Sequence, residues 1–213
     1  MDWRGWHDAY DDPGSHLSRR LEVVQERIRV ALDEAPPGPL RVISVCAGQG
    51  RDLLPVLMDH PRRDDVRARL VELDPHNAGV ARTAAQAAGL TTVEVVEGDA
   101  GQTDQYLGLV PANLVLVCGV FGNISDEDIE RTVGFCRQLC ARDGTVIWTR
   151  HRKPPDMCAQ AVLWFEANGF ERIWVRDADI RQGIGVHRFA DDPDPLTPGE
   201  RMFTFVGYDT LRR

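Results

Sequence analysis

The sequence predicts an α/β protein with a doubly wound, mostly parallel sheet of seven strands, helices on both faces and an antiparallel C-terminal edge. Two observations carry this prediction. Strand-like apolar segments alternate with helix-like segments over most of the chain, as the crossovers of a parallel sheet require. Beyond residue 184 the strand-like segments have little helix between them, which is typical of antiparallel pairing at a sheet edge.

The first helix is expected over residues 15–32, where apolar residues recur with the helical period. Ser15 precedes it as the expected N-cap, and the proline-rich run 35–39 ends it. We treat residues 1–39 as an N-terminal segment with one helix and residues 40–213 as a single domain.

The remaining elements follow in alternation. Strand-like segments occupy residues 40–46, 68–73, 93–97, 113–118, 144–149 and 170–175. Helices are expected over residues 52–58, 77–88, 104–107, 125–141 and 156–168. Segments 185–189 and 201–208 are also strand-like and are expected to form hairpin-like, antiparallel strands.

Composition and charge narrow the class of protein. The chain has 213 residues with 43% apolar and 27% charged content, which suits one soluble domain with its own core. The net charge of -8 argues against general binding to nucleic acid or to anionic membranes. The arginine cluster at residues 62–69 is interspersed with aspartates, so we interpret it as a solvated loop. No apolar run is long enough for a membrane span, and the N-terminus does not resemble a secretory signal.

The five cysteines are odd in number and contain no CxxC motif, which predicts a cytoplasmic protein with free thiols. Cys136 and Cys140 are four residues apart and could share a metal ion. Neither has a histidine or acidic partner at ligand spacing, so we favour a core-facing stripe and expect no metal site.

A glycine turn and three strand-end carboxylates indicate a ligand site. Gly48 and Gly50 follow the first strand and would let a ligand approach the backbone closely. Glu72 and Asp74 lie at the end of the second strand, and Asp99 follows the third. Because ligands bind beyond the carboxyl ends of such strands, either of the first two carboxylates could accept hydrogen bonds from a ribose, and Asp99 could accept from an adenine amine.

The series VISVCAGQG, VELDP, VEGDA and ANLVLVCGVFGNI resembles class I S-adenosylmethionine-dependent methyltransferases of the small-molecule type, over roughly residues 40–150. The resemblance implies a Rossmann-like domain and S-adenosylmethionine as cofactor. It assigns Ala47, Gly48 and Gly50 to the methionine part, Glu72 in preference to Asp74 to the ribose, Asp99 and Ala100 to adenine, and Cys118 and Gly119 to the sulfonium end.

The first strand departs from the family pattern, which usually has an acidic residue near the first glycine. Ser44 and Cys46 stand there instead, so we expect Asp52 or a backbone carbonyl to hold the ammonium group of the cofactor. A nicotinamide dinucleotide is disfavoured, because its fingerprint needs a third glycine where Leu53 stands and would place Asp52 beside a pyrophosphate. A nucleotide-binding or regulatory protein of the same fold, without transferase activity, is the alternative.

The acceptor is expected to be a small molecule. Methyltransferases that act on nucleobase or glutamine amino groups carry an [Asn/Asp]-Pro-Pro-aromatic tetrapeptide after the fourth strand, and the sequence there is CGVFGNI. Together with the acidic charge, this argues against DNA and moderately against RNA. A homodimer is compatible with the sequence.

The N-terminal segment supplies one group of candidate site residues. Trp3, Trp6, His7 and Tyr10 share one face of a helical turn, and such a segment often forms a lid over the cofactor in related enzymes. Packing of the tryptophans onto the core is the alternative. His7 and Tyr10 bring polar tips to an apolar face, so we predict His7 as a catalytic residue and Tyr10 as a cofactor contact.

Later segments supply the other candidates. His151 follows the fifth strand and is a candidate general base, and Arg150 could pair with an acidic group of the acceptor. A solvated loop is the alternative for both. Asn123 after the fourth strand and His187 in the C-terminal edge are further candidate acceptor contacts.

Overall fold

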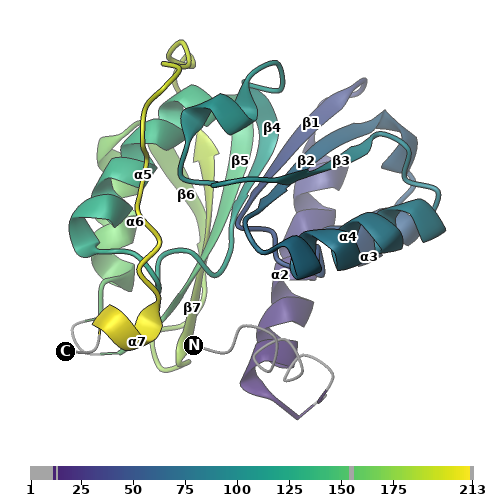
Figure 1. Ribbon diagram of the computed structural model, residues 1–213. Coiled ribbons are helices and arrows are strands. Elements are labelled where there is room, and N and C mark those ends of the chain that lie inside the picture. The colour runs from purple at the N-terminus through teal and green to yellow at the C-terminus, as the bar shows by residue number, and fades with distance from the viewer. Residues whose placement is uncertain (1–11, 13, 154–155, 212–213) are drawn as a thin grey trace.

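The computed structural model describes residues 12, 14–153 and 156–211, and it confirms the predicted fold class. The described residues form one seven-stranded sheet of order β3-β2-β1-β4-β5-β7-β6 (Figure 1). The strands are β1 Leu40–Val45, β2 Val66–Glu72, β3 Val93–Glu97, β4 Ala112–Val117, β5 Cys140–His151, β6 Phe170–Val175 and β7 Gln182–Phe189. Strands β1 to β5 pair in parallel, whereas β7 runs antiparallel to both β5 and β6.

The order of the strands reverses between β1 and β4. From β1 the chain moves outward to β2 and β3, then returns to place β4 on the other side of β1. The loops that leave β1 and β4 therefore diverge at the carboxyl edge of the sheet, which is where open α/β sheets bind ligands.

Helices cover both faces of the sheet. They are α2 His16–Glu34, α3 Leu54–Asp59, α4 Pro75–Ala87, α5 Asp126–Leu139, α6 Cys158–Ala167 and α7 Tyr208–Leu211, with 3-10 turns η1 Arg63–Asp65 and η2 Thr103–Tyr106. Buried side chains of α2, α3 and α4 pack in one hydrophobic cluster, and those of α5 and α6 pack in the other, so the sheet is wound on both sides (Figure 1). None of the helices in the described ranges is long and apolar enough to cross a membrane.

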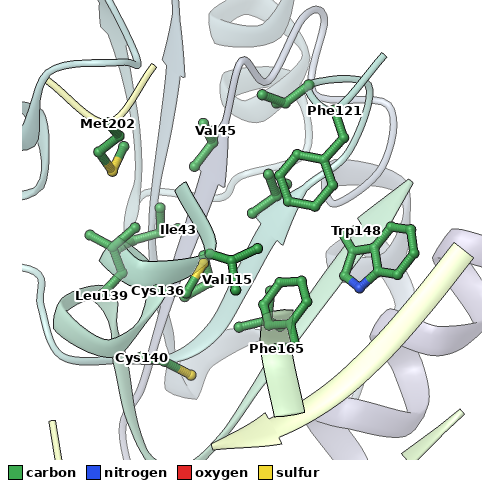
Figure 2. Packing of buried hydrophobic residues seen from close by; sticks show 14 of the residues in the cluster. Ile43, Val45, Val115, Phe121, Cys136, Leu139, Cys140, Trp148, Phe165 and Met202 are labelled. Atoms are coloured by element: carbon green, nitrogen blue, oxygen red, sulfur yellow. The ribbon is translucent and has the colours of Figure 1, made fainter. Parts of the chain in front are cut away.

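The cluster under α5 and α6 is centred on aromatic side chains (Figure 2). The ring centroid of Trp148 lies 5.8 Å from that of Phe121 and 6.2 Å from that of Phe165. The thiols of Cys136 and Cys140 are buried in the same cluster, and burial raises the pKa of Cys136 to about 12. These thiols therefore pack as small apolar groups. Among the described residues no three His, Cys, Asp or Glu side chains gather as a metal site would require.

The segment predicted as a last strand, residues 201–208, does not join the sheet. Arg201 forms an isolated bridge with Gln102, and the chain then continues without pairing to α7. Its apolar residues Met202 and Phe203 are buried in the cluster with α5. The apolar pattern arises because the segment packs on the α5 side of the molecule, so the expectation of a strand was wrong.

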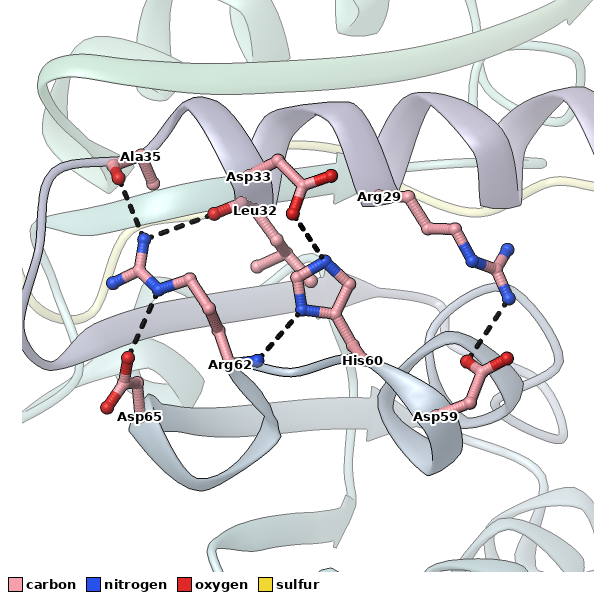
Figure 3. A network of polar contacts seen from close by, with 8 residues as sticks. All are labelled: Arg29, Leu32, Asp33, Ala35, Asp59, His60, Arg62 and Asp65. Atoms are coloured by element: carbon pink, nitrogen blue, oxygen red, sulfur yellow. Dashed lines mark hydrogen bonds and ion pairs between the residues drawn. The ribbon is translucent and has the colours of Figure 1, made fainter.

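The expected first helix is confirmed, and Ser15 is its N-cap, accepting a hydrogen bond from the backbone N–H of Ser18 at 3.0 Å. The end of this helix depends on Arg62. The Arg62 guanidinium donates to the carbonyl oxygens of Leu32 and Ala35 (Figure 3). It also donates to the carbonyl oxygens of Pro36 and Gly38. Its side chain is only 17% exposed, so the interpretation of this cluster as a solvated loop was wrong for Arg62. The arginine satisfies carbonyls that the helix end leaves without an internal partner.

Candidate functional site

A cavity of about 420 Å³ lies at the carboxyl edge of the sheet, within the size range of small-molecule sites. Residues that follow β1, β2, β3 and β4 all contribute to its wall. Of the residues predicted to bind a cofactor, the lining includes Ala47, Gly48, Glu72, Asp74, Asp99, Ala100, Cys118 and Gly119. Asn123, a predicted acceptor contact, lines the same cavity.

The turn after β1 has an unusual backbone that places its main chain against the cavity. Cys46, Gly48 and Gly50 all have positive φ angles, of 51°, 55° and 73°. Gly48 lines the cavity and donates its N–H to Glu72. A side chain at Gly50 would collide with those of Leu54 and Leu70. Gly50 therefore lets α3 pack closely on the sheet, and the expectation that it lines the methionine part of the cavity was wrong.

Glu72 and Asp74 have different tasks. The Oε2 atom of Glu72 accepts from the Gly48 N–H at 2.7 Å, and its Oε1 atom accepts from the Asp74 N–H at 2.9 Å. Each carboxylate oxygen has a further lone pair, so Glu72 can still accept from a ligand. Burial raises the pKa of Glu72. Asp74 instead caps α4 by accepting from the Asn77 N–H at 2.9 Å, and the preference for Glu72 as the ligand-binding carboxylate stays a prediction.

The end of the cavity beside β3 is shaped by Asp99 and its partners. Asp99 accepts from the Gly101 N–H and from Arg201 Nη1, both at 2.9 Å. Leu73 lines the same cavity with a side chain that is 64% exposed. An exposed apolar side chain and a carboxylate in one cavity wall suit a flat, polar-edged ligand such as a nucleobase.

Three interacting polar side chains line another part of the cavity: Asp52 and Arg20, which are half-buried, and Cys118, which is buried. Burial raises the pKa of the Asp52 carboxyl, and the positive charge of Arg20 opposes this. The Asp52 carboxyl shares a hydrogen bond with the Cys118 thiol, and burial also raises the pKa of that thiol. Arg20 was not predicted, because its only local signal is its place on an amphipathic helix.

Phe203 and Phe205 also line the cavity and were not predicted as site residues. They belong to a segment about 100 residues beyond β3 in the sequence, which reaches the cavity through tertiary contacts alone. Asn123 is held beside them, since its side-chain amide donates to the Gly119 carbonyl at 2.7 Å. Its own carbonyl accepts from the N–H groups of Val206 and Gly207 at 3.0 Å.

Besides Gly50, three predicted residues in the described ranges do not line the cavity. Arg150 donates to the carbonyl oxygen of Phe121 and forms an ion pair with Asp126, so it stabilises the loop after β4. His151 pairs with Gln182 in the sheet, and burial lowers its pKa. These contacts show that both residues stabilise the local structure. Neither lines the cavity, so its geometry does not support the expectation that they contact a substrate.

His187, the third, is fully buried in the aromatic core, and the expectation that it contacts substrate was wrong. Its ring lies 4.6 Å from that of Phe165, and its Nδ1 atom accepts from Trp148 Nε1 at 3.2 Å. Burial lowers the pKa of His187 to about 4. The candidates Trp3, Trp6, His7 and Tyr10 lie outside the described residues.

A family model described as "Putative methyltransferase" matches residues 5–173 of the chain. A comparison with curated proteins found no match. Among solved structures, an O-methyltransferase family protein from Burkholderia thailandensis gives a TM-score of 0.66 at 17% identity, covering 90% of this chain and 61% of that one. The CurJ carbon methyltransferase gives 0.64 at 13% identity, covering 80% of this chain and 54% of that one. The chain thus spans less than two thirds of both proteins.

Magnesium protoporphyrin IX methyltransferase from Synechocystis PCC 6803, in a crystal structure with bound SAH, gives a TM-score of 0.64 at 13% identity. That match covers 87% of this chain and 93% of the Synechocystis protein. These likenesses establish a shared fold. The family model covers most of the sequence, including the carboxyl ends of β1 to β4 that line the cavity, but not the segment with Phe203 and Phe205. The chain therefore belongs to the methyltransferase family that this model describes.

Proposed function

We propose that this protein transfers a methyl group from S-adenosylmethionine to a small-molecule acceptor. The observation that carries the proposal is the set of groups that line one cavity, which the strand order β3-β2-β1-β4 arranges: Asp99 after β3, Glu72 at the end of β2, the glycine turn after β1, and Cys118 and Gly119 after β4. The methyltransferase resemblance assigns these groups, in the same order, to the adenine, ribose, methionine and sulfonium parts of the cofactor.

The residues present fit this cofactor. Glu72 is fixed by two backbone N–H groups and keeps lone pairs for the ribose hydroxyls. Asp52 is a half-buried carboxyl with a raised pKa, and a cationic ammonium group would stabilise its charged form. A pyrophosphate would instead meet the charge of Asp52, which argues against a nicotinamide dinucleotide.

When bound, S-adenosylmethionine supplies the methyl group and the positively charged sulfur from which it leaves. The chain contributes position: its backbone turn and carboxylates hold the donor, and the β4 exit with Asn123 bounds the space for the acceptor. No histidine is found among the described residues that line the cavity. Catalysis in this proposal rests on alignment, and a catalytic role for His7 stays a prediction.

Several structural relatives are named for small-molecule or atom-specific methylation, among them the magnesium protoporphyrin IX, carbon and O-methyltransferases. Their variety supports a small acceptor and leaves the methylated atom open. The expectations of a cytoplasmic location, of no DNA or RNA acceptor and of a compatible homodimer remain predictions.

Titration calorimetry with S-adenosylmethionine, S-adenosylhomocysteine and NAD tests the cofactor. We expect binding of the first two and none of NAD; the reverse pattern would overturn the proposal. Incubating the protein with methyl-labelled cofactor and a metabolite extract then tests transfer. Cofactor binding without label in any small molecule would favour the alternative of a binding or regulatory protein.

A further inference from the structure

The C-terminal part of the chain crosses from the β3 end of the cavity to the β4 end. We call residues 199–207 the strap. In Figure 1 the yellow chain that contains it passes along α5 before reaching α7. The strap is fixed along its length by backbone hydrogen bonds. The N–H of Met202 donates to Gly101 at 2.8 Å, that of Thr204 to Asp128 Oδ2 at 2.9 Å, and that of Val206 to Asn123 at 3.0 Å.

Because it is anchored at both ends, the strap holds two aromatic side chains against the cavity. Phe203 is buried, whereas Phe205 lines the cavity and remains 36% exposed. Phe205 lies next to Val206, which bonds to Asn123 at the β4 exit. The exit of β4 is the side on which the proposed function places the acceptor. An exposed aromatic side chain at that place offers a flat apolar surface.

The charges around the cavity favour a neutral occupant. Its described lining holds four carboxylates, Asp52, Glu72, Asp74 and Asp99, against two arginines. Arg20 interacts with Asp52, and Arg51 donates to the side chain of Gln49 at 3.0 Å. An anionic acceptor would be repelled by the carboxylates. A protonated amine would be attracted by them, but it has no lone pair to attack the methyl group and would have to lose its proton beside the sulfonium group of the proposed cofactor.

We propose that the strap completes the acceptor end of the cavity and that Phe205 is a specificity-determining residue, which selects a neutral acceptor with a flat aromatic or conjugated ring. This inference rests on the proposed function, since it takes the β4 end of the cavity as the acceptor end. It adds two points to the proposed function: the chemical class of the acceptor, and a role for the strap in forming the site.

The test measures binding of 2-naphthol, a neutral flat probe, to the full chain saturated with S-adenosylhomocysteine. Cyclohexanol is the non-planar competitor. The variants are Phe205→Ser, which removes the ring, and Phe205→Leu, which keeps an apolar side chain without a flat face. Leu163→Ser is the matched control, because Leu163 is an exposed apolar residue on α6 and does not line the cavity. Calorimetry gives the affinity of every variant for S-adenosylhomocysteine.

We expect 2-naphthol to bind to the wild-type complex and cyclohexanol to compete poorly. The affinity for 2-naphthol should fall about tenfold in Phe205→Ser and several-fold in Phe205→Leu, the range expected for loss of an aromatic contact. It should be unchanged in Leu163→Ser, and the affinity for S-adenosylhomocysteine should stay within about threefold in all variants.

Two results would overturn the inference while leaving the proposed function intact: no binding of 2-naphthol to the loaded wild-type protein, or equal binding to wild type and Phe205→Ser. Equal competition by cyclohexanol would also overturn it. Failure of the wild-type protein to bind S-adenosylhomocysteine would instead overturn the proposed function itself.

Discussion

The substitution Gly101→Ala tests whether the strap is held as the structure shows. A methyl group at Gly101 would collide with the carbonyl oxygen of Phe203 and would lie 3.1 Å from Asp99 Oδ1. The strap would have to retreat by roughly 1 Å to reach ordinary van der Waals separation. That shift lengthens the 2.8 Å bond between Met202 N–H and the Gly101 carbonyl beyond hydrogen-bonding distance.

The expected cost follows from the interactions that this shift weakens. One backbone bond at about 1 kcal/mol, the loosened pair between Arg201 and Asp99, and partial exposure of Met202 and Phe203 together give a loss of about 2–3 kcal/mol. For a chain of this length, that corresponds to a fall in Tm of roughly 5–10 °C.

The assay combines thermal unfolding with hydrogen exchange at the amides of Met202, Thr204 and Val206, which should lose protection. Gly79→Ala is the control, because a methyl group there meets nothing within 4 Å. It lies inside α4, so it should stabilise the helix by about 0.5–1 kcal/mol. If Gly101→Ala were as stable and as protected as wild type, the described packing of the strap would be refuted.

Three further predictions concern cofactor binding, the end of α2 and the buried histidine. Glu72→Gln should weaken binding of S-adenosylhomocysteine about 10- to 100-fold in calorimetry, because an amide cannot accept from both backbone N–H groups and the ribose. The cap-preserving Asp74→Asn should change it less than about threefold, and a larger effect there would reverse the assignment. Arg62→Ala should lower the free energy of unfolding by about 2–4 kcal/mol in urea titrations, because it removes hydrogen bonds to the end of α2. The control Arg29→Ala removes a more exposed ion pair and should lower it by under about 1 kcal/mol. Equal losses in the two variants would contradict the capping role of Arg62. His187 is neutral in the folded protein down to a pKa of about 4 but is protonated near pH 6.5 when unfolded, so stability should fall by about 2–3 kcal/mol as the pH drops from 6.5 to 4. His187→Phe should lose that part of the pH dependence, and an unchanged slope would refute the burial argument.

The sheet could be predicted because its signals are local. The parallel strands β1 and β4 are short apolar runs, and helix-like segments separate the strands along the chain, as α3 follows Leu40–Val45. The glycine turn and the carboxylates after β2 and β3 could be predicted for the same reason. Parallel strands bring their carboxyl ends to one edge, so residues far apart in sequence become neighbours without any knowledge of packing.

Predictions failed where a side chain's partner decides its role. Gly48 and Gly50 occupy the same turn, yet only Gly48 faces the cavity, because Gly50 meets side chains of α3 and β2. His187 lies on strand β7, and the sequence does not show which face of the sheet its side chain joins. In the structure Phe165 stacks on its ring, so a ligand cannot reach it.

The same limitation applies to the strap and to Arg62. The alternation in residues 201–208 does not distinguish a sheet strand from a chain packed against a helix, since both bury part of their side chains. Arg62 looked solvated because its acceptors lie 24 to 30 residues away.

The amino-acid sequence by itself determined the order of strands and helices, the turn after β1 and the row of carboxylates, since backbone preference and periodicity act over a few residues. Only the tertiary structure decided which of those groups face the cavity and which close the core. It also brought Arg20, Phe203 and Phe205 to the site, because contacts between distant segments depend on how helices and loops pack and leave no repeating pattern in the chain.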